Sequence, residues 1–303
     1  MAAAELAQVR AMLSGLGAGL PLEDLRGVYD AVGTQFPAAP DVALRADRVG
    51  EIAGEWARSP GSDADRVILY IHGGGFAVGS IASHRHVAIE LGRLAGAGTF
   101  AIDYRRSPEH PFPAAQEDCL AAYRFLLDAG FAPERIALAG DSAGGGLAVS
   151  TLIAARDAGL PQPACAVCLS PWFDLEVEGA SMTAKAAEDP LVQREALLGM
   201  AALYLGGAAS DHPLASPVHG DLSGLAPLLL QVGSAETLLD DSVRLAGVAG
   251  AAGVDVRLEV WPEMVHTWHF FHPILGEGRR ALAVAGDYVR GRLGAPSRAS
   301  AAA

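Results

Sequence analysis

The sequence is poor in positive charge and in charge of any kind, and each shortage excludes a class of protein. Only 22 of its 303 residues are Lys or Arg, against 35 Asp or Glu, which gives a formal net charge of −13. A surface that acidic repels phosphate backbones, so we expect no nucleic-acid partner. Charged residues make up 19% of the chain and hydrophobic residues 51%, a balance that excludes general disorder.

Cysteine is also scarce, and three residues are too few for a disulfide framework. Cys165 and Cys168 form a C-x-x-C inside an apolar segment that is typical of a buried strand. Residues three apart on a strand point to opposite faces, so these two thiols cannot easily share a metal ion. The histidines show no spacing typical of zinc sites either. We therefore expect no metal site.

Long apolar runs and targeting patterns are missing as well. The N-terminal residues show no basic region followed by an apolar one, as a secretory signal would. The longest nearly uncharged run, residues 137–155, is interrupted by Asp141 and a glycine-rich turn. We expect a protein without a membrane span, located in the cytoplasm, with a frayed C-terminal tail at residues 295–303.

Short apolar runs alternate with helix-like stretches from residue 66 onward. The predicted strands are 66–71, 99–103, 135–140, 164–170, 227–233 and 254–261, and the predicted helices are 83–97, 112–130, 143–159 and 274–293. Near-continuous apolar strands separated by helices are typical of a mostly parallel sheet covered on both faces. We predict one α/β domain over residues 1–303, with a small helical cap from about 1–45 and 178–212.

The pentapeptide GDSAG, residues 140–144, stands between a predicted strand and a predicted helix, as a nucleophile elbow does. So tight a turn requires Gly140 and Gly144, because side chains there would clash. The turn would push the Ser142 hydroxyl outward at a helix N-terminus, where backbone N–H groups favour developing negative charge. Ser142 is therefore the predicted nucleophile.

A second motif, HGGGF at residues 72–76, follows the strand predicted at 66–71. Consecutive glycines let a loop approach a reacting centre closely and aim its amides at one point. We expect the N–H groups of Gly73, Gly74 and Ala143 to form an oxyanion hole. A flexible glycine turn is the alternative interpretation of the motif taken alone.

A nucleophilic serine needs a base, and the chain offers nine histidines. His266 lies beyond the last predicted strand and before the last helix, where an α/β hydrolase places its base. His269 and His272 are rivals, but each lies further into the following aromatic segment. His266 is therefore the predicted base.

The third member of such a triad is a carboxylate that fixes the imidazole tautomer. The order Ser, acid, His places it in the loop after the strand at 227–233. Glu236 is favoured because it comes first beyond the strand end. Asp240 and Asp241 are typical of the first turn of the following helix, but they remain open alternatives.

These motifs, together with DYRRSPEHPFPAA at 103–115 and SPWFDL at 170–175, resemble the hormone-sensitive lipase-like esterases, bacterial family IV. The resemblance runs from about residue 48 to 290. It implies an α/β-hydrolase fold and carboxylic ester hydrolysis without a cofactor, with Ser142 as nucleophile and His266 as base. It also implies possible homodimers, for which the strand at 254–261 would be the pairing edge. The usual acid motif D-P-L-x-D reads E-T-L-L-D here, and the surrounding pattern is similar to that of monoterpene ε-lactone hydrolases.

The expected substrate is a small, uncharged, short-chain ester or lactone, since the acidic surface disfavours anionic ones. Trp172 and Phe173 could wall an acyl pocket and Trp268 an alcohol pocket, or each could be ordinary core. We predict a serine carboxylesterase that works through an acyl-enzyme. An amidase or peptidase with the same triad, and a non-catalytic binding protein on this fold, remain alternatives.

Overall fold

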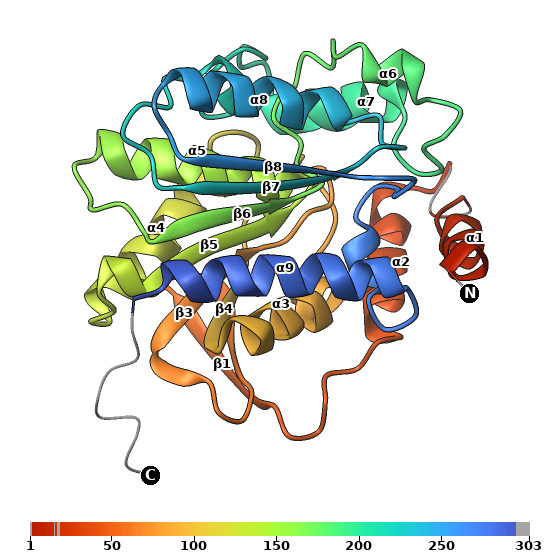
Figure 1. Cartoon of the computed structure of the whole chain (residues 1–303). Coiled ribbons are helices and arrows are strands. Elements are labelled where there is room, and N and C mark those ends of the chain that lie inside the picture. Colours follow the sequence, from red (N-terminus) through yellow and green to blue (C-terminus); the bar gives the residue numbers. More distant parts are fainter. Residues whose placement is uncertain (1, 15, 17–18, 295–303) are drawn as a thin grey trace.

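Eight strands of the described residues form one sheet in the order β1-β2-β4-β3-β5-β6-β7-β8 (Figure 1). The computed structural model describes residues 2–14, 16 and 19–294, so the tail predicted to fray lies outside them. Strands β3 to β8 pair in parallel, which confirms the predicted sheet. The strands are β1 (Ala43–Val49), β2 (Ile52–Arg58), β3 (Asp63–Ile71), β4 (Ala97–Asp103), β5 (Ile136–Asp141), β6 (Cys165–Leu169), β7 (Leu228–Gly233) and β8 (Val256–Trp261).

The hairpin of β1 and β2 is the part of the sheet that the sequence pattern did not predict. β2 runs antiparallel to β4, and β1 runs antiparallel to β2 at the sheet edge. Most of β1 is exposed, so its polar sequence ALRADRV carries no run of buried apolar residues. β1 begins at Ala43, within the segment of about 1–45 that is predicted to belong to the cap.

Helices cover both faces of the sheet, close to where the sequence predicts them (Figure 1). One face carries α3 (Ile81–Ala95) and α9 (Gly276–Arg292), and the other carries α4 (Ala114–Asp128), α5 (Ala143–Asp157) and α8 (Leu239–Ala251). Cys165 packs toward the first face and Cys168 toward the second. Both thiols are buried and free, so the prediction that they face opposite ways is confirmed.

Four further helices gather at the carboxyl end of the parallel strands (Figure 1). They are α1 (Ala2–Leu13), α2 (Leu22–Thr34), α6 (Ser181–Ala184) and α7 (Arg194–Leu205). Short 3-10 turns complete the described elements, at Pro133–Arg135, Pro217–His219 and Trp268–Phe271. No helix among the residues described has both the length and the apolar run needed to cross a bilayer.

The side chain of Arg26 ties helix α2 to the loops that follow β3 and β4. Arg26 donates from Nε to the carbonyl of Ala77 at 2.8 Å and from Nη2 to that of Ser107 at 3.0 Å. Its guanidinium also pairs with Glu109, at 2.8 and 2.7 Å. These contacts hold α2 over the loop that contains the glycine motif.

Candidate active site

Ser142 occupies the sharp turn between β5 and α5. Its backbone has φ 51° and ψ −122°, a conformation that non-glycine residues rarely adopt and that is typical of functional sites. A Cβ on Gly140 would lie 2.3 Å from the Gly144 carbonyl oxygen, and one on Gly144 would lie 2.1 Å from that of Ile71. Both positions therefore have no room for a side chain, as the sequence predicts for an elbow.

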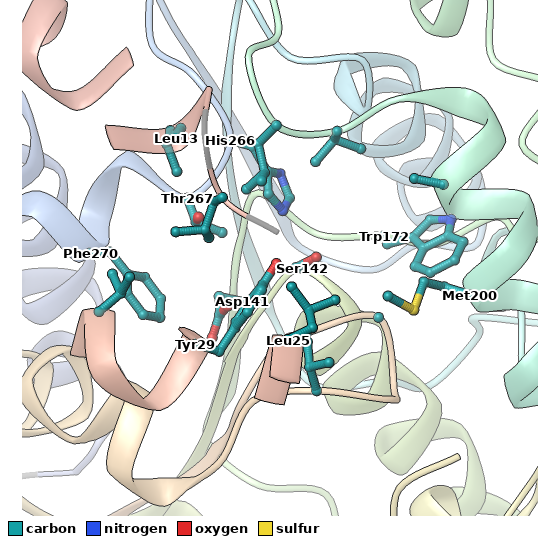
Figure 2. Close-up of a pocket in the computed structure, with 18 of the residues that line it drawn as sticks. Leu13, Leu25, Tyr29, Asp141, Ser142, Trp172, Met200, His266, Thr267 and Phe270 are labelled. Carbon is teal, nitrogen blue, oxygen red and sulfur yellow. The ribbon is translucent and has the colours of Figure 1, made fainter. Parts of the chain in front are cut away.

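A cavity of about 180 Å³ lies over Ser142 and is lined mainly by apolar side chains (Figure 2). Its walls come from α1, α2 and α7, from the glycine loop and from the loop after β8. The His266 ring also lines it and points toward Ser142 (Figure 2). The apolar lining consists of Leu13, Leu16, Leu25, Val32, Val78, Trp172, Leu191, Val192, Ala196, Leu197, Met200, Phe270 and Phe271.

Glu236 lies behind His266, on the side away from the cavity. Its Oε2 is 3.0 Å from Nδ1 of the imidazole, which leaves Nε2 for the cavity. Its Oε1 accepts hydrogen bonds from Ser170 Oγ at 2.7 Å and from the Gly233 N–H at 2.6 Å. Burial disfavours the charged imidazolium, but the hydrogen bond and the charge of Glu236 outweigh it and raise the pKa of His266.

The two alternative carboxylates are engaged elsewhere. Asp240 accepts the backbone N–H of Ser181 at 2.8 Å. Asp241 accepts two backbone N–H groups of the segment after β6, at 2.8 and 2.9 Å. Both residues lie in the first turn of α8, as their position in the sequence predicts. Of the three candidates, the structure brings Glu236 to His266.

The rival histidines are not at the cavity. His269 is fully buried, and its Nε2 lies 3.0 Å from Oε1 of Gln231 on β7. His272 stacks on His86, on the far side of the same loop. Neither is among the residues that line the cavity over Ser142.

Gly73 does not present its N–H to the cavity, which corrects the predicted oxyanion hole. This N–H lies 3.2 Å from Oδ1 of Asp141 and 3.2 Å from Nε2 of His84, so it points into the protein. Gly74 and Gly75 line the cavity instead, and within the described chain neither N–H has an acceptor. Three adjacent glycines look alike in sequence, so the sequence carries no signal that separates Gly73 from Gly75.

Ala143 is the first residue of α5, and its N–H has no acceptor inside the helix for that reason. Gly74 adopts φ +111° and Gly75 φ +57°, values that suit glycine and turn the loop over the elbow. The backbone N–H groups of Gly74, Gly75 and Ala143 are therefore the set that can meet a negative charge near Ser142.

Asp141, the residue before Ser142, holds the glycine loop in place. Besides the Gly73 N–H, its carboxylate accepts the Tyr70 hydroxyl at 2.9 Å and lies 3.2 Å from His84 Nε2. Burial disfavours its charge, but His84 and Tyr70 outweigh burial and lower the pKa of Asp141. The loop and the elbow are thus held together by one buried anion.

The predicted pocket aromatics separate into two groups. Trp172 lines the cavity, and its Nε1 donates to the carbonyl of Asp174 at 2.8 Å. Phe173 and Trp268 are fully buried in the hydrophobic core and are not among the lining residues. Neighbours in sequence point in different directions, so one aromatic of a pair faces the cavity while the other packs behind it.

Several lining residues were missed by sequence reasoning. Leu25 and Tyr29 come from α2, and Met200 comes from α7. Both helices were predicted as additions to the sheet, but which of their side chains face the site depends on how they dock. The only sequence signal that could have pointed to these side chains is the apolar stripe along α2.

Among the residues that the structure describes, one group of side chains could hold a cation, and it lies away from the cavity. His219 Nε2 is 3.3 Å from Asp174 and 3.2 Å from Glu176. Arg244 already pairs with the Asp174 carboxylate. Since this guanidinium neutralises the buried acid, the group is explained as an ion-pair network.

Comparison with known proteins agrees with this geometry. The family described as the alpha/beta hydrolase fold matches residues 68–270. The chain is 55% identical over 246 residues to an acetyl-hydrolase of Streptomyces hygroscopicus, covering 81% of this chain and 82% of that one. It is 34% identical over 260 residues to an esterase of Acinetobacter venetianus, covering 86% of each.

Solved structures are similar over almost the whole chain. One is an esterase from the bacterial hormone-sensitive lipase family, with a TM-score of 0.93, 47% identity and coverage of 96% of this chain and 98% of that one. Another is the esterase EstE5, soaked with p-nitrophenyl butyrate, with a TM-score of 0.92, 44% identity and coverage of 96% and 99%.

Proposed function

The chain belongs to the bacterial hormone-sensitive lipase family of α/β hydrolases, whose members are carboxylic esterases, and we propose that Ser142, His266 and Glu236 are its catalytic triad. The chain is accordingly a carboxylic ester hydrolase. The observation that carries the triad is the 3.0 Å contact of Glu236 with His266, whose ring faces Ser142 across the cavity.

In the proposed mechanism, His266 Nε2 removes the proton of Ser142 Oγ, and the serine oxygen attacks the ester carbonyl. Glu236 stabilises the imidazolium that forms. His266 then gives its proton to the leaving alcohol, which leaves an acyl-enzyme on Ser142. Water, activated by the same imidazole, hydrolyses this ester in the reverse sequence. The chain supplies nucleophile and base, so the reaction needs no cofactor.

The oxyanion of each tetrahedral intermediate would accept hydrogen bonds from the N–H groups of Gly74, Gly75 and Ala143. Three preorganised donors in a cavity lined mainly by apolar side chains stabilise this charge more than water would. Asp141 supports the arrangement by holding Gly73, the residue before the donors.

The proposed substrates are short-chain, uncharged esters, with lactones as a second possibility. A cavity of about 180 Å³ suits a small acyl group better than a long chain. The names of relatives agree, since one is an acetyl-hydrolase and another was soaked with p-nitrophenyl butyrate. The many apolar side chains and the net charge of −13 both disfavour anionic esters.

Hydrolysis of p-nitrophenyl acetate, butyrate, octanoate and laurate by the purified protein tests this proposal. We expect kcat/KM to fall beyond the butyrate, and Ser142→Ala to remove activity on all four. Matched amides would be cleaved far more slowly. Unchanged activity in Ser142→Ala would refute the triad, and faster cleavage of the amides would favour an amidase.

We also propose that two copies of the chain form a homodimer by pairing through β8. β8 is the last strand of the sheet, and Val260 on it is 44% exposed. An antiparallel copy centred on Leu258 would place Arg257 opposite Glu259 of the second chain, a favourable charge pair. Sedimentation equilibrium should give twice the chain mass, and Leu258→Pro should give the monomer. A monomeric parent protein would refute it.

We further propose that residues 1–303 form a single domain in which α1, α2, α6 and α7 serve as a cap. All four lie at the edge of the sheet where Ser142 is found. The proposed location is the cytoplasm, which agrees with the three unpaired thiols.

A further inference from the structure

Tyr29 brings a hydroxyl group to the cavity from α2, one of the four helices at the carboxyl end of the parallel strands. It lies on α2, is half-buried and lines the same cavity as Ser142. Its side chain points toward Ser142 (Figure 2). In the described part of the chain, no side chain or backbone group makes a hydrogen bond with this hydroxyl. Tyr29 thus faces the site with a hydroxyl that has no hydrogen-bond partner among the described residues.

The state of the hydroxyl makes it a donor. Burial, with the nearby charge of Asp141, raises the pKa of Tyr29 to about 12, so the phenol is neutral at ordinary pH. Gln193 also lines the cavity, and its amide nitrogen donates to the carbonyls of Ala186 and Asp189, so that donor is already used within the protein. Since the Tyr29 O–H has no acceptor among the described residues, it is available to donate to a ligand in the cavity.

The cavity has two sides, and Tyr29 is on the side of the base. Figure 2 shows Thr267 and Phe270 on the same side of Ser142 as Tyr29, with Trp172 and Met200 on the other. In the proposed mechanism, His266 protonates the departing alcohol, so the alcohol oxygen must lie within reach of His266. The portion of the substrate next to Thr267 and Tyr29 is then the leaving group.

We propose that Tyr29 is a specificity-determining residue that donates a hydrogen bond to an acceptor atom on the alcohol portion of the ester. The inference rests on the proposed esterase mechanism and names a substrate class for it: short acyl esters of alcohols that carry an ether, hydroxyl or carbonyl oxygen. The wall formed by Trp172 and Met200 offers no comparable donor, so it holds the apolar acyl group.

Two pairs of matched esters test this assignment. 2-Methoxyethyl acetate and butyl acetate differ by one oxygen in the alcohol. Methyl 3-methoxypropanoate and methyl pentanoate differ by one oxygen in the acyl group. The hydrolysis of each ester is measured with the parent enzyme, with Tyr29→Phe and with the control variant Tyr288→Phe. Tyr288 lies on α9, away from the cavity, and its hydroxyl also has no partner among the described groups.

The expected result is a selective loss. Tyr29→Phe should lower kcat/KM for 2-methoxyethyl acetate about 3- to 10-fold, the usual effect of one neutral hydrogen bond, and change the other three esters less than about twofold. Tyr288→Phe should change none of them selectively. An equal fall on both acetates, or no fall on either, overturns the proposal. If Tyr29→Phe instead lowers kcat/KM selectively for methyl 3-methoxypropanoate, the assignment of Tyr29 to the alcohol side is wrong.

Failure of the mechanism itself would be recognised separately. Ser142→Ala should hydrolyse none of the four esters. Activity retained in that variant would refute the proposed triad whatever Tyr29→Phe does. With Ser142→Ala inactive, an unchanged preference in Tyr29→Phe refutes the role of Tyr29 alone.

Discussion

Glu236 Oε2 lies 3.0 Å from His266 Nδ1, and the other oxygen of the same carboxylate is bound by Ser170 and Gly233. One oxygen is therefore fixed by the sheet edge, and the second is free to serve the imidazole alone. Glu236 and His266 are 0% and 4% exposed, so water does not compete for this contact.

Glu236→Gln should lower kcat/KM by about 10²- to 10⁴-fold, because an amide neither fixes the tautomer nor stabilises the imidazolium. The acidic limb of the pH–rate profile should also move. Glu236 raises the pKa of His266 above its usual 6.5, so activity in the parent falls as pH drops through that raised value. Without the carboxylate, burial lowers this pKa, and the midpoint shifts to lower pH.

Asp241→Asn is the matched control for that experiment. Burial raises the pKa of Asp241 to about 7, so near neutral pH an amide resembles the group already present. Activity should stay within about threefold of the parent, on the same pH profile. A large loss here, with a mild effect of Glu236→Gln, would transfer the role of the acid to Asp241.

Gly144→Ala should destabilise the fold by about 3 kcal/mol, since its Cβ would meet the Ile71 carbonyl oxygen at 2.1 Å. Gly247→Ala is the control, because that glycine lies inside α8 with no atom within 4 Å of the added carbon. It should stabilise the protein by up to about 1 kcal/mol. Urea unfolding measures both, and equal effects would contradict the steric account.

Arg26→Ala should raise KM and lower the melting temperature, because Arg26 ties α2 to the carbonyls of Ala77 and Ser107. Charged hydrogen bonds of this kind contribute about 1.5–3 kcal/mol each. Glu109 is 53% exposed, so its ion pair with Arg26 contributes under about 1 kcal/mol. Glu109→Gln should therefore have a small effect. A larger effect of Glu109→Gln than of Arg26→Ala would show that the ion pair, and not the hydrogen bonds to the two carbonyls, holds α2 in place.

His269 should make the protein less stable in mild acid. Burial lowers its pKa to about 3 in the folded state, whereas an unfolded chain protonates it near 6.5. Between these values the unfolded state binds more protons, so the free energy of unfolding falls as pH falls. His269→Gln should reduce this slope by about 1.4 kcal/mol per pH unit. Denaturant titrations from pH 7 to pH 5 measure it; an unchanged slope would contradict the prediction.

The central sheet and the elbow were predictable because their sequence signals are steric and periodic. Buried parallel strands are apolar throughout, and Gly140 and Gly144 are required wherever a strand turns so sharply into a helix. β1 gave no such signal, because an exposed edge strand has a polar sequence.

Within the site, the sequence predicted which residues come together better than which way they point. Glu236 and His266 meet because both follow strands that end at the same edge of the sheet. The N–H of Gly73 was predicted to face the site but points into the protein, because it is directed at the buried carboxylate of Asp141. Tyr29 could not be found at all, because its place follows from the docking of α2.

The three buried cysteines have a practical consequence. Burial raises the pKa of every thiol, that of Cys165 to about 12, and none is exposed to solvent. Cys165 and Cys168 lie on the two sides of the sheet, and Cys119 lies on α4. A maleimide added to the native protein can therefore react only when the sheet or its covering helices open. The labelling rate of each cysteine then measures how often the layer around it opens.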